Sequence, residues 1–491
     1  MARKPSRTRA SEHSPSLVAV ILAAGEGKRM KSALPKVLHP VAGRPMVEHV
    51  VLAARQAGAS RIVVVVGHGG EAVEQVLRER LDTTDLRFAV QQQRRGTADA
   101  VSAAAGHLRG ARGEVLILCG DVPSLPGRAL GNLVRRHRRR RAALTVLTAA
   151  LDDPTGYGRI VRNAEGAIEA IVEHRDASEQ QRAIREINTG TYCANWPALR
   201  RALGRIRPDN AQGEYYLTDA VREVLAEGQR VDACLHQRPE EALGVNSRQH
   251  LAAAHRVRSA QVLDALMAKG VTILDPTSTW IHDTVRIGRD TVIHPGVCLE
   301  GNTRIGKRCV VRSGCRLTDV VVADRVTLLE GTVGTDSSIG AGTQVGPYAH
   351  LRPGTVLGAE CKVGNFVETK KARFGRGSKA SHLSYIGDAE VGRRVNIGAG
   401  TITCNYDGVN KHRTELDDGV FIGSDTQLVA PVRVGKGAYV GAGATITRDV
   451  PAGSLAVSRV EQKNIEGWVA RKKKKMAAQK KKKSGSGKSR R

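Results

Sequence analysis

Short apolar runs alternate with helix-like stretches over residues 17–245. Runs with the length and β-branched content of strands occupy residues 16–23, 61–66, 114–118, 144–148 and 167–172. Apolar residues with helical spacing lie between several of them, as at residues 46–57 and 70–81. This alternation predicts an α/β domain of Rossmann-like type, whose mixed, mostly parallel sheet is covered by helices on both faces. Ligands of such domains bind at the carboxyl ends of the strands.

A different period begins near residue 271. Aliphatic residues recur every six positions, and glycine often follows them directly. The series is Ile287, Ile293, Leu299, Ile305, Val311 and Leu317, then Val333, Ile339, Val345, Leu351, Leu357 and Val363, then Val391 and Ile397, then Ile422, Leu428, Val434, Val440 and Ile446. A period of six fits neither a helix nor an ordinary strand. It predicts a prism-shaped β-helix of hexapeptide repeats, in which each repeat forms one flat side and the aliphatic residue points inward.

These patterns divide the chain into five segments. We expect a disordered basic extension over residues 1–16, the α/β domain over 17–245, and a linker helix over 246–270, where apolar residues follow one stripe and Gly270 ends the pattern. The β-helix domain would occupy residues 271–460. A basic disordered tail would occupy residues 461–491.

Charge and composition indicate which partners and which cellular compartment the protein has. The net charge is +29, but twelve Lys or Arg residues lie within residues 471–491 and six arginines within 135–141. No aromatic residues are interleaved with the tail charges, so we expect no specific nucleic-acid partner. The eight cysteines form no C-x-x-C pair, and no apolar run is long enough to span a membrane. Together these features predict a cytoplasmic protein without membrane insertion.

The first strand runs into a glycine turn with basic residues. Residues 22–30 have the sequence L-A-A-G-E-G-K-R-M, and L-P-K follows at residues 34–36. Backbone N–H groups of such a turn can bind phosphate oxygens. Met30 stands where a dinucleotide-binding fingerprint requires its third glycine, and no P-loop is present. On its own the turn is as compatible with a purely structural role as with phosphate binding.

The sequence of this turn resembles the signature of sugar-1-phosphate nucleotidyltransferases. Later segments resemble the N-acetylglucosamine-1-phosphate uridylyltransferase branch and follow in that family's order. They are Gln91 with G-T-A at residues 96–98, G-D-V-P at 120–123, G-Y-G-R at 156–159, I-V-E-H at 171–174, E-I-N-T-G at 186–190 and V-N at 245–246. One departure is Cys119, where many members of the family have tyrosine.

The resemblance implies roles for individual residues. Asp121 and Asn246 would bind Mg²⁺, and Arg29 and Lys36 would stabilise charge during transfer from UTP. Backbone and side chains at Leu22, Ala23, Ala24, Gly25, Gln91, Gly96 and Thr97 would contact UTP. Gly158, Glu173 and Asn188 would hold the sugar and its N-acetyl group. Together with the residues that contact UTP and with Asn246, they would bind UDP-N-acetylglucosamine.

The hexapeptide rhythm is interrupted at residues 403–411 by a polar loop. This loop and its surroundings resemble the acetyltransferase half of bifunctional glucosamine-1-phosphate N-acetyltransferases, which implies a left-handed parallel β-helix. Matching segments are H-L-R-P-G at residues 350–354, N-F-V-E at 365–368, K-K-A-R at 370–373, H-L-S-Y at 382–385, N-I-G-A-G-T-I-T-C-N-Y-D-G at 396–408 and G-S-D-T-Q-L-V-A-P at 423–431.

The same resemblance implies that His382 is the general base for acetyl transfer. An isolated histidine on a β-helix is usually a solvated surface residue, but imidazole also has the pKa that a base at neutral pH requires. Arg352, Lys370, Tyr385 and Asn396 would bind glucosamine-1-phosphate. Ala399, Asn405, Tyr406, Ser424, Ala442 and Arg459 would contact acetyl-CoA, with Asn405 also orienting the sugar ring and a backbone N–H near Ala399 stabilising the oxyanion.

The chain is therefore expected to be a bifunctional enzyme of UDP-N-acetylglucosamine synthesis that uses Mg²⁺, UTP and acetyl-CoA. Members of the family form homotrimers, and we expect the same here. Two other hypotheses stay open at this point. One is a nucleotidyltransferase whose β-helix serves only for oligomerisation, and the other is a nucleic-acid-binding protein suggested by charge alone.

Overall fold

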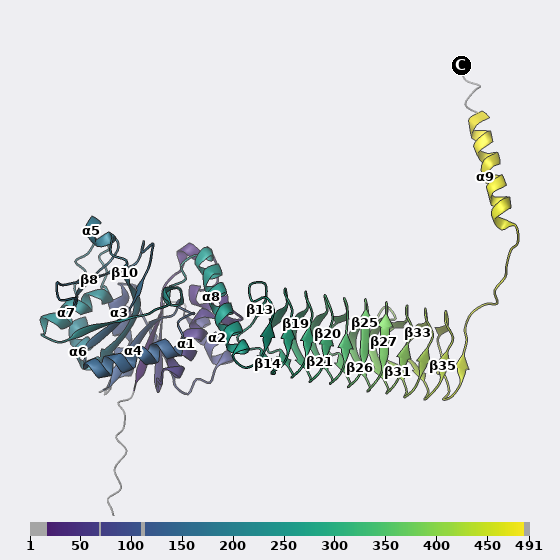
Figure 1. Ribbon diagram of the computed structural model, residues 1–491, viewed down its shortest axis with the longest axis horizontal. Coiled ribbons are helices and arrows are strands. Elements are labelled where there is room, and N and C mark those ends of the chain that lie inside the picture. Colours follow the sequence, from purple (N-terminus) through teal and green to yellow (C-terminus); the bar gives the residue numbers. More distant parts are fainter. Residues whose placement is uncertain (1–16, 68–69, 110–112, 486–491) are drawn as a thin grey trace, which may run out of the picture. The chain divides into compact units, whose positions relative to one another are not determined.

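The computed structural model describes residues 17–67, 70–109 and 113–485 (Figure 1). The chain divides into two compact units, residues 1–319 and 320–491, which are described separately below. The expected disordered extension, residues 1–16, lies outside the described residues. Within the described ranges, no helix combines the length and the apolar character needed to cross a membrane.

The first unit contains a mixed sheet with strand order β11-β7-β10-β6-β1-β4-β5, to which β8 and β9 are attached through β10. Its strands are β1 (Val18–Ala23), β4 (Arg61–Val66), β5 (Leu86–Val90), β6 (Glu114–Cys119), β7 (Leu144–Ala150), β8 (Arg159–Arg162), β9 (Ile168–Val172), β10 (Glu186–Asn195) and β11 (Val231–Leu235). β1, β4, β5 and β6 are parallel to one another, as are β7 and β11, whereas β10 runs antiparallel to β6 and β7. The predicted α/β fold class is confirmed.

Both faces of this sheet are buried. Alternate residues of β1 belong to opposite cores: Val18 and Val20 to one, Ala19 and Ile21 to the other. The first core includes residues of α3 (Thr97–Ala103), α6 (Trp196–Leu203) and α7 (Ala220–Ala226), and the second those of α1 (Met46–Gln56), α2 (Glu71–Arg80) and α4 (Gly127–Arg140). Burial on both sides explains why the strands read as continuous apolar runs rather than as alternating ones.

Short elements complete the domain and follow the strand ends. They are η1 (Lys28–Met30), η2 (Lys36–Leu38), β2 (Pro40–Val41), β3 (Arg44–Pro45), η3 (Ala104–Leu108), α5 (Glu179–Arg182), η4 (Leu217–Asp219) and η5 (Pro239–Ala242). η1 and η2 follow β1, so the chain that carries the basic residues of the glycine turn lies at the carboxyl edge of the sheet.

Helix α8 (Arg248–Met267) follows and packs against both α/β elements and the first β-helix coil of the same unit. Ser247 caps its first turn by accepting a hydrogen bond from the His250 N–H at 3.2 Å. Arg258 of α8 donates a hydrogen bond at 2.8 Å to Asp283, a residue of the first coil. Asp283 also faces the buried His49 of α1, at 3.6 Å from Nδ1. Polar and charged groups therefore connect α1, α8 and this coil.

The first coils of the β-helix belong to the first unit. Their strands are β12 (Thr272–Ile273), β13 (Trp280–Ile281), β14 (Arg286–Ile287), β15 (Val292–Ile293), β16 (Cys298–Glu300), β17 (Arg304–Ile305), β18 (Val310–Val311) and β19 (Arg316–Val322). Residues that pair in register lie one coil apart, as Trp280 with Cys298 and Arg286 with Arg304. All pairs are parallel, as stacked coils require.

The second unit continues this architecture in its own parallel stacks. One stack contains β20 (Thr327–Leu328), β22 (Gln344–Val345), β25 (Lys362–Asn365), β27 (Lys379–His382), β29 (Asn396–Ile397), β32 (Phe421–Ile422), β35 (Tyr439–Val440) and β37 (Leu455–Ala456). A second contains β21 (Val333–Ile339), β23 (His350–Leu351), β26 (Glu368–Phe374), β28 (Tyr385–Val391), β30 (Ile402–Cys404), β33 (Gln427–Val429) and β36 (Thr445–Ile446). β24 (Val356–Leu357), β31 (Thr414–Leu416) and β34 (Val432–Val434) form a further side, which the long strands β21, β26 and β28 reach by turning a corner.

Most aliphatic residues of the six-residue series point into the coil, as predicted. Val345, Leu351, Val363 and Leu428 are all fully buried. Val333 is an exception, because it is 37% exposed and the adjacent Gly334 takes the inward position. The left-handed residue Asp336 (φ 40°) turns β21 around a corner, so that the spacing from Gly334 to the next inward aliphatic residue, Ile339, is shorter than six. The predicted hexapeptide β-helix is otherwise confirmed.

The basic tail differs from the disorder expected of it. Residues Trp468–Gly485 form helix α9, which is coloured yellow in Figure 1. The segment contains lysine, alanine, methionine and glutamine and no proline, and these residue types have high helix propensity. The concentration of basic residues, on which the expectation of disorder rested, does not prevent a helix in this structure.

Candidate active sites

The turn after β1 requires glycine at position 27. Gly27 has a φ of +68°, and a Cβ atom there would lie 2.6 Å from the Cβ of Lys36. The absence of a side chain therefore lets η1 approach the residue that begins η2. In the same turn, Glu26 forms ion pairs with Lys28 at 2.9 Å and with Arg94. Arg29 lies in η1 with its side chain exposed.

Three predicted residues meet at the carboxyl end of the sheet. Lys36 donates hydrogen bonds from Nζ to Asp121 Oδ2 and, at 3.0 Å, to Asn246 Oδ1. Asp121 follows β6, and the neighbouring Val245 N–H donates to its carbonyl oxygen at 2.9 Å. A backbone hydrogen bond therefore brings Asn246 from the end of the domain to the carboxyl end of β6. The predicted set of Lys36, Asp121 and Asn246 is one cluster in space.

This cluster suits a magnesium ion that is shared with a substrate. The oxygens of Asp121 and Asn246 converge on a single cation, and the Lys36 ammonium occupies that place. Among the described residues, no three His, Cys, Asp or Glu side chains gather as a metal-binding group. Magnesium accepts one or two protein oxygens and completes its shell with water and substrate phosphates, so this donor set fits it.

Three of the residues expected to contact UTP lie around the N-terminus of α3. The Gln91 side-chain amide donates to Gly96 O at 3.1 Å and to Asp99 Oδ2 at 2.9 Å, so it fixes the loop between β5 and α3. Gly96 has a φ of +118°, and a Cβ there would lie 2.4 Å from the Tyr215 carbonyl oxygen. Thr97 accepts a hydrogen bond from the Leu217 N–H at 2.9 Å. Gln91, Gly96 and Thr97 thus form one rigid loop.

The expected sugar contacts form a second group on β8, β9 and β10. The Asn188 N–H donates to Gly158 O at 2.9 Å, and a Cβ on Gly158 would lie 3.4 Å from Glu173 Oε1. Burial raises the pKa of the Glu173 carboxyl, which accepts a hydrogen bond from Thr218 at 3.3 Å. The carboxyl of Glu173 therefore lies close to Gly158, among the residues expected to hold the sugar.

Cys119 connects the sugar group to β6. Its Sγ lies 3.5 Å from the Gly190 carbonyl oxygen, while the Gly190 N–H donates to Asn188 Oδ1 at 2.9 Å. Burial, together with the neighbouring Asp121, raises the pKa of the Cys119 thiol to about 12. The thiol is therefore neutral near pH 7 and supports the part of β10 that carries Asn188.

In the second unit, His382 lies at the end of β27 and is exposed. Its Nδ1 is 2.5 Å from Oδ1 of Asn365, its partner in register on β25. Because an amide oxygen can only accept, Nδ1 carries the proton and the lone pair of Nε2 is left available. The buried Ser384 hydroxyl donates to the His382 carbonyl at 2.9 Å and fixes the backbone of the histidine.

Three cationic side chains lie on neighbouring coils. Arg352 donates to Glu368 Oε1 at 2.6 Å. The pKa of the Lys370 ammonium is lowered, first by contact with Lys411 and then by Arg352. Like charges held together at the surface stabilise a bound anion. Tyr385 belongs to the same region, since its hydroxyl lies over Gly387, the register partner of Lys370.

The polar loop that interrupts the repeats is held by its own hydrogen bonds. Asp407 accepts from the N–H groups of Val409 and Asn410 at 2.8 and 2.6 Å, and from His412 at 2.7 Å. These donors lower the pKa of the Asp407 carboxyl. Asn405 is anchored by its amide, which donates to Asp388 at 2.5 Å, while Tyr406 is 61% exposed. The loop therefore presents Tyr406 to solvent from a fixed base.

The remaining predicted residues are spread along the coils. Asn396 begins β29 and pairs in register with Lys379. The Ala399 carbonyl accepts from the Asp425 N–H at 2.6 Å. Arg459 donates to the Ala442 carbonyl at 2.8 Å, and the Ser424 carbonyl accepts from the Gly443 N–H at 2.8 Å. Ala442 and Arg459 are therefore in contact, and among the described residues no hydrogen bond joins this group directly to His382.

Asn365 and Lys411 were not among the residues predicted for the sites. The contact of Asn365 with His382 could have been predicted from the sequence. Residues about one coil apart lie side by side, and Asn365 precedes His382 by 17 positions. Lys411 lies within the predicted loop, but its approach to Lys370 depends on how the loop folds. An antiparallel bridge between Tyr406 and Lys411 brings this lysine back toward the coils.

Family models match most of this architecture. The nucleotidyl transferase model matches residues 18–239, a GMPPB C-terminal domain model matches residues 276–374, and the model of six bacterial transferase hexapeptide repeats matches residues 413–448. A protein of Pelobacter propionicus named bifunctional protein GlmU is 52% identical over 461 residues, which are 94% of this chain and 99% of that protein. The chain belongs to the GlmU family.

Other GlmU relatives agree. The bifunctional protein GlmU of Trichlorobacter lovleyi is 52% identical over 93% of this chain and 98% of its own length. Among solved structures, UDP-glucose pyrophosphorylase complexed with UDP-glucose aligns at 16% identity and a TM-score of 0.42, over 50% of this chain and 99% of its own. GlmU membership confirms the prediction of an enzyme with both a nucleotidyltransferase and an acyltransferase activity.

Proposed function

We propose that the chain makes UDP-N-acetylglucosamine from glucosamine-1-phosphate in two steps. The β-helix domain acetylates the amine with acetyl-CoA, and the α/β domain then transfers uridylate from UTP. The observation that carries this proposal is the hydrogen bond between Asn365 and His382, because it leaves Nε2 available as a base. A β-helix that served only for oligomerisation would not need a histidine held in one tautomer.

In the acetyl transfer, His382 acts as the general base. Its Nε2 takes a proton from the amine of glucosamine-1-phosphate, the nitrogen attacks the thioester carbonyl, and the C–S bond breaks to release the coenzyme A thiolate. Arg352 and Lys370, with Lys411 beside them, bind the sugar phosphate, and Tyr385 and Asn396 orient the ring. A backbone N–H near Ala399 stabilises the oxyanion, and Asn405, Tyr406, Ser424, Ala442 and Arg459 contact acetyl-CoA.

In the uridylyl transfer, no general base is required. A phosphate oxygen of N-acetylglucosamine-1-phosphate is already anionic and attacks the α-phosphorus of UTP, with pyrophosphate leaving. Arg29 and Lys36 stabilise the charge on the phosphates. Leu22, Ala23, Ala24, Gly25, Gln91, Gly96 and Thr97 contact the nucleotide, while Gly158, Glu173 and Asn188 hold the sugar.

Asp121 and Asn246 would hold Mg²⁺ in this step. When bound, the ion supplies positive charge to the triphosphate. The present contact of Lys36 with both oxygens supports the assignment, since the same oxygens already stabilise a cation. When a metal occupies that place, the Lys36 ammonium is free to neutralise a phosphate.

The proposal includes a cytoplasmic homotrimer. His382, Leu383 and Tyr406 are exposed on a single chain, with Leu383 at 60% and Tyr406 at 61%. A base that removes a proton from an amine works best in a site from which water is excluded. A neighbouring copy that covers this face would supply the missing wall of the site.

The test measures both reactions on the wild-type chain and on His382→Ala and Asp121→Ala. We expect His382→Ala to lose acetyl transfer by about 10²–10⁴-fold, the usual contribution of a general base, and to keep pyrophosphate release. Asp121→Ala should show the opposite pattern. Absence of acetyl transfer in the wild-type chain would establish the β-helix as a scaffold and would refute the two-step proposal.

A further inference from the structure

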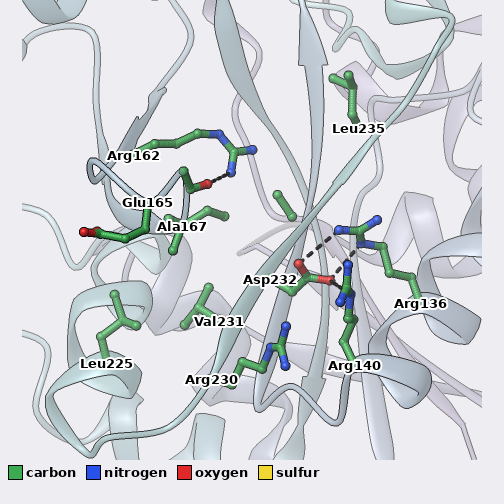
Figure 2. Close-up of a pocket in the computed structure, with 13 residues that line it drawn as sticks. Arg136, Arg140, Arg162, Glu165, Ala167, Leu225, Arg230, Val231, Asp232 and Leu235 are labelled. Atoms are coloured by element: carbon green, nitrogen blue, oxygen red, sulfur yellow. Dashed lines mark hydrogen bonds and ion pairs between the residues drawn. The ribbon is translucent and has the colours of Figure 1, made fainter.

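A cavity of about 600 Å³ lies beside the edge strand β11, away from the candidate nucleotidyltransferase site of the same unit. Figure 2 shows its walls: the C-terminal part of α4, the β8–β9 hairpin and β11 itself. It is lined by Arg136, Arg140, Arg162, Glu165, Gly166, Ala167, Ile168, Leu225, Arg230, Val231, Asp232, Ala233 and Leu235. Its volume is in the range of pockets that hold small organic ligands. Strands β7 and β10 separate β11 from β6, which leads to Asp121.

Two of its four arginines are neutralised by carboxylates. Arg136 donates to both oxygens of Asp232, at 2.8 and 3.1 Å. Arg162 donates to both oxygens of Glu186, at 2.8 and 2.7 Å. Each carboxylate is therefore engaged by one guanidinium in a bidentate pair.

The other two arginines have no carboxylate of their own. Arg140 approaches Asp232 Oδ2 only to 4.0 Å, and that oxygen already accepts from Arg136. Arg230 forms no ion pair within the described part of the chain. Glu165 is exposed, and Figure 2 shows its carboxylate turned away from the guanidinium groups. The cavity therefore carries an excess of positive charge.

The dipole of helix α4 accounts for only part of this group of arginines. Basic residues in the last turn of α4, including Arg140, favour the negative end of the helix dipole. Arg162 ends β8 and Arg230 precedes β11, so neither belongs to that helix. Their convergence on the same space is not explained by the dipole.

The rest of the lining is apolar. Leu225 and Leu235 face the cavity together with Val231 and Ile168, which are largely buried. Arginine forks recognise phosphate or carboxylate oxygens, and the aliphatic side chains offer no polar partner. We propose that this cavity is a binding site for a small organic polyanion, whose phosphate or carboxylate groups contact Arg140 and Arg230 and whose carbon skeleton packs against Leu225 and Leu235.

Calorimetric titration of the full chain at low ionic strength tests this site. The probes are fructose 1,6-bisphosphate for phosphate groups and citrate for carboxylates, and each is titrated into wild type and into Arg140→Gln/Arg230→Gln. At least one probe should bind wild type at up to millimolar concentration. The double variant should bind it about tenfold more weakly or worse, as expected for losing charge-assisted hydrogen bonds.

A matched control separates the site from general charge. Arg139→Gln/Arg141→Gln removes the same charge from neighbouring residues that do not line the cavity, and it should bind the probe like wild type. Thermal unfolding of each variant verifies that it is folded. Equal weakening in both double variants, unchanged binding in Arg140→Gln/Arg230→Gln, or no binding of either probe to wild type would each overturn the proposal.

Discussion

Asn365 Oδ1 lies 2.5 Å from Nδ1 of His382, one coil further along the β-helix. The contact fixes the ring orientation and the tautomer without placing a charge beside the imidazole, because an amide does not ionise. A carboxylate at the same position would favour the protonated ring and so leave a smaller fraction of it as the free base near neutral pH.

Substitution of Asn365 should therefore affect acetyl transfer in a predictable way. Asn365→Ala removes the acceptor, and we expect kcat for acetyl transfer to fall by about tenfold to hundredfold, less than for loss of the base itself. Asn365→Asp keeps an acceptor but adds negative charge, so the acidic limb of the pH–rate profile should move to higher pH. Uridylyl transfer serves as the internal control and should not change.

Lys411 should control the charge of Lys370. The nearby Lys411 lowers the pKa of the Lys370 ammonium. As pH rises, Lys370 in the wild-type chain therefore loses its positive charge at a lower pH than an isolated lysine would. In Lys411→Gln the KM for glucosamine-1-phosphate should increase by about tenfold near pH 7, since one phosphate contact is lost. The alkaline rise of KM should also move to higher pH. Lys463→Gln, an exposed lysine outside the cluster, is the matched control.

His49 should make the stability of the first unit dependent on pH. Burial, with Arg258 as the next contribution, lowers its pKa from 6.5 to about 4, while its Nε2 donates to the Val41 carbonyl at 2.7 Å. The unfolded chain binds a proton below about pH 6.5 that the folded chain does not accept until about pH 4, so stability falls as pH decreases through this window. Urea denaturation at a series of pH values measures the loss.

A variant isolates this contribution. His49→Gln retains a donor for Val41 but cannot titrate, so its unfolding free energy should vary less between pH 6.5 and 4. His250→Gln, in which an exposed histidine is replaced, should keep the wild-type dependence. An identical pH dependence in His49→Gln and wild type would show that other groups cause it.

Substitution of Gly96 should weaken the binding of UTP. Gly96→Ala places a methyl group 2.4 Å from the Tyr215 carbonyl at a φ of +118°, so the loop that holds Gln91 must move. We expect a KM for UTP raised about tenfold or more, with acetyl transfer retained. Gly106→Ala is the control, because nothing lies within 4 Å of a Cβ there and its φ is not positive.

The fold could be predicted from the sequence because its patterns are local. Six-residue spacing identified the inward positions of the β-helix, and continuous apolar runs identified the strands of the sheet. Motif residues such as Lys36, Asp121 and Asn246 were predicted from the resemblance and do converge. Val333 was assigned inward because a strict period cannot reveal where a left-handed corner shortens a side.

Other features depend on distance in three dimensions. Lys411 reaches Lys370 only after its loop has folded back, and Arg140, Arg162 and Arg230 share a cavity although they lie far apart in the chain. The helix α9 shows a different difficulty, since the lysines that suggested disorder also have high helix propensity. Side-chain convergence between distant segments leaves no periodic trace in the sequence.

The polar loop at residues 403–411 leaves the coils on either side of it in register. Tyr385 pairs with Ile402 one coil later, and Ile402 pairs with Gln427 beyond the loop, even though the first interval is 17 residues and the second is 25. The stacked coils therefore tolerate an insertion at this corner without a change in their core. Mutation and selection can therefore lengthen, shorten or exchange the loop while the inherited scaffold stays as it is.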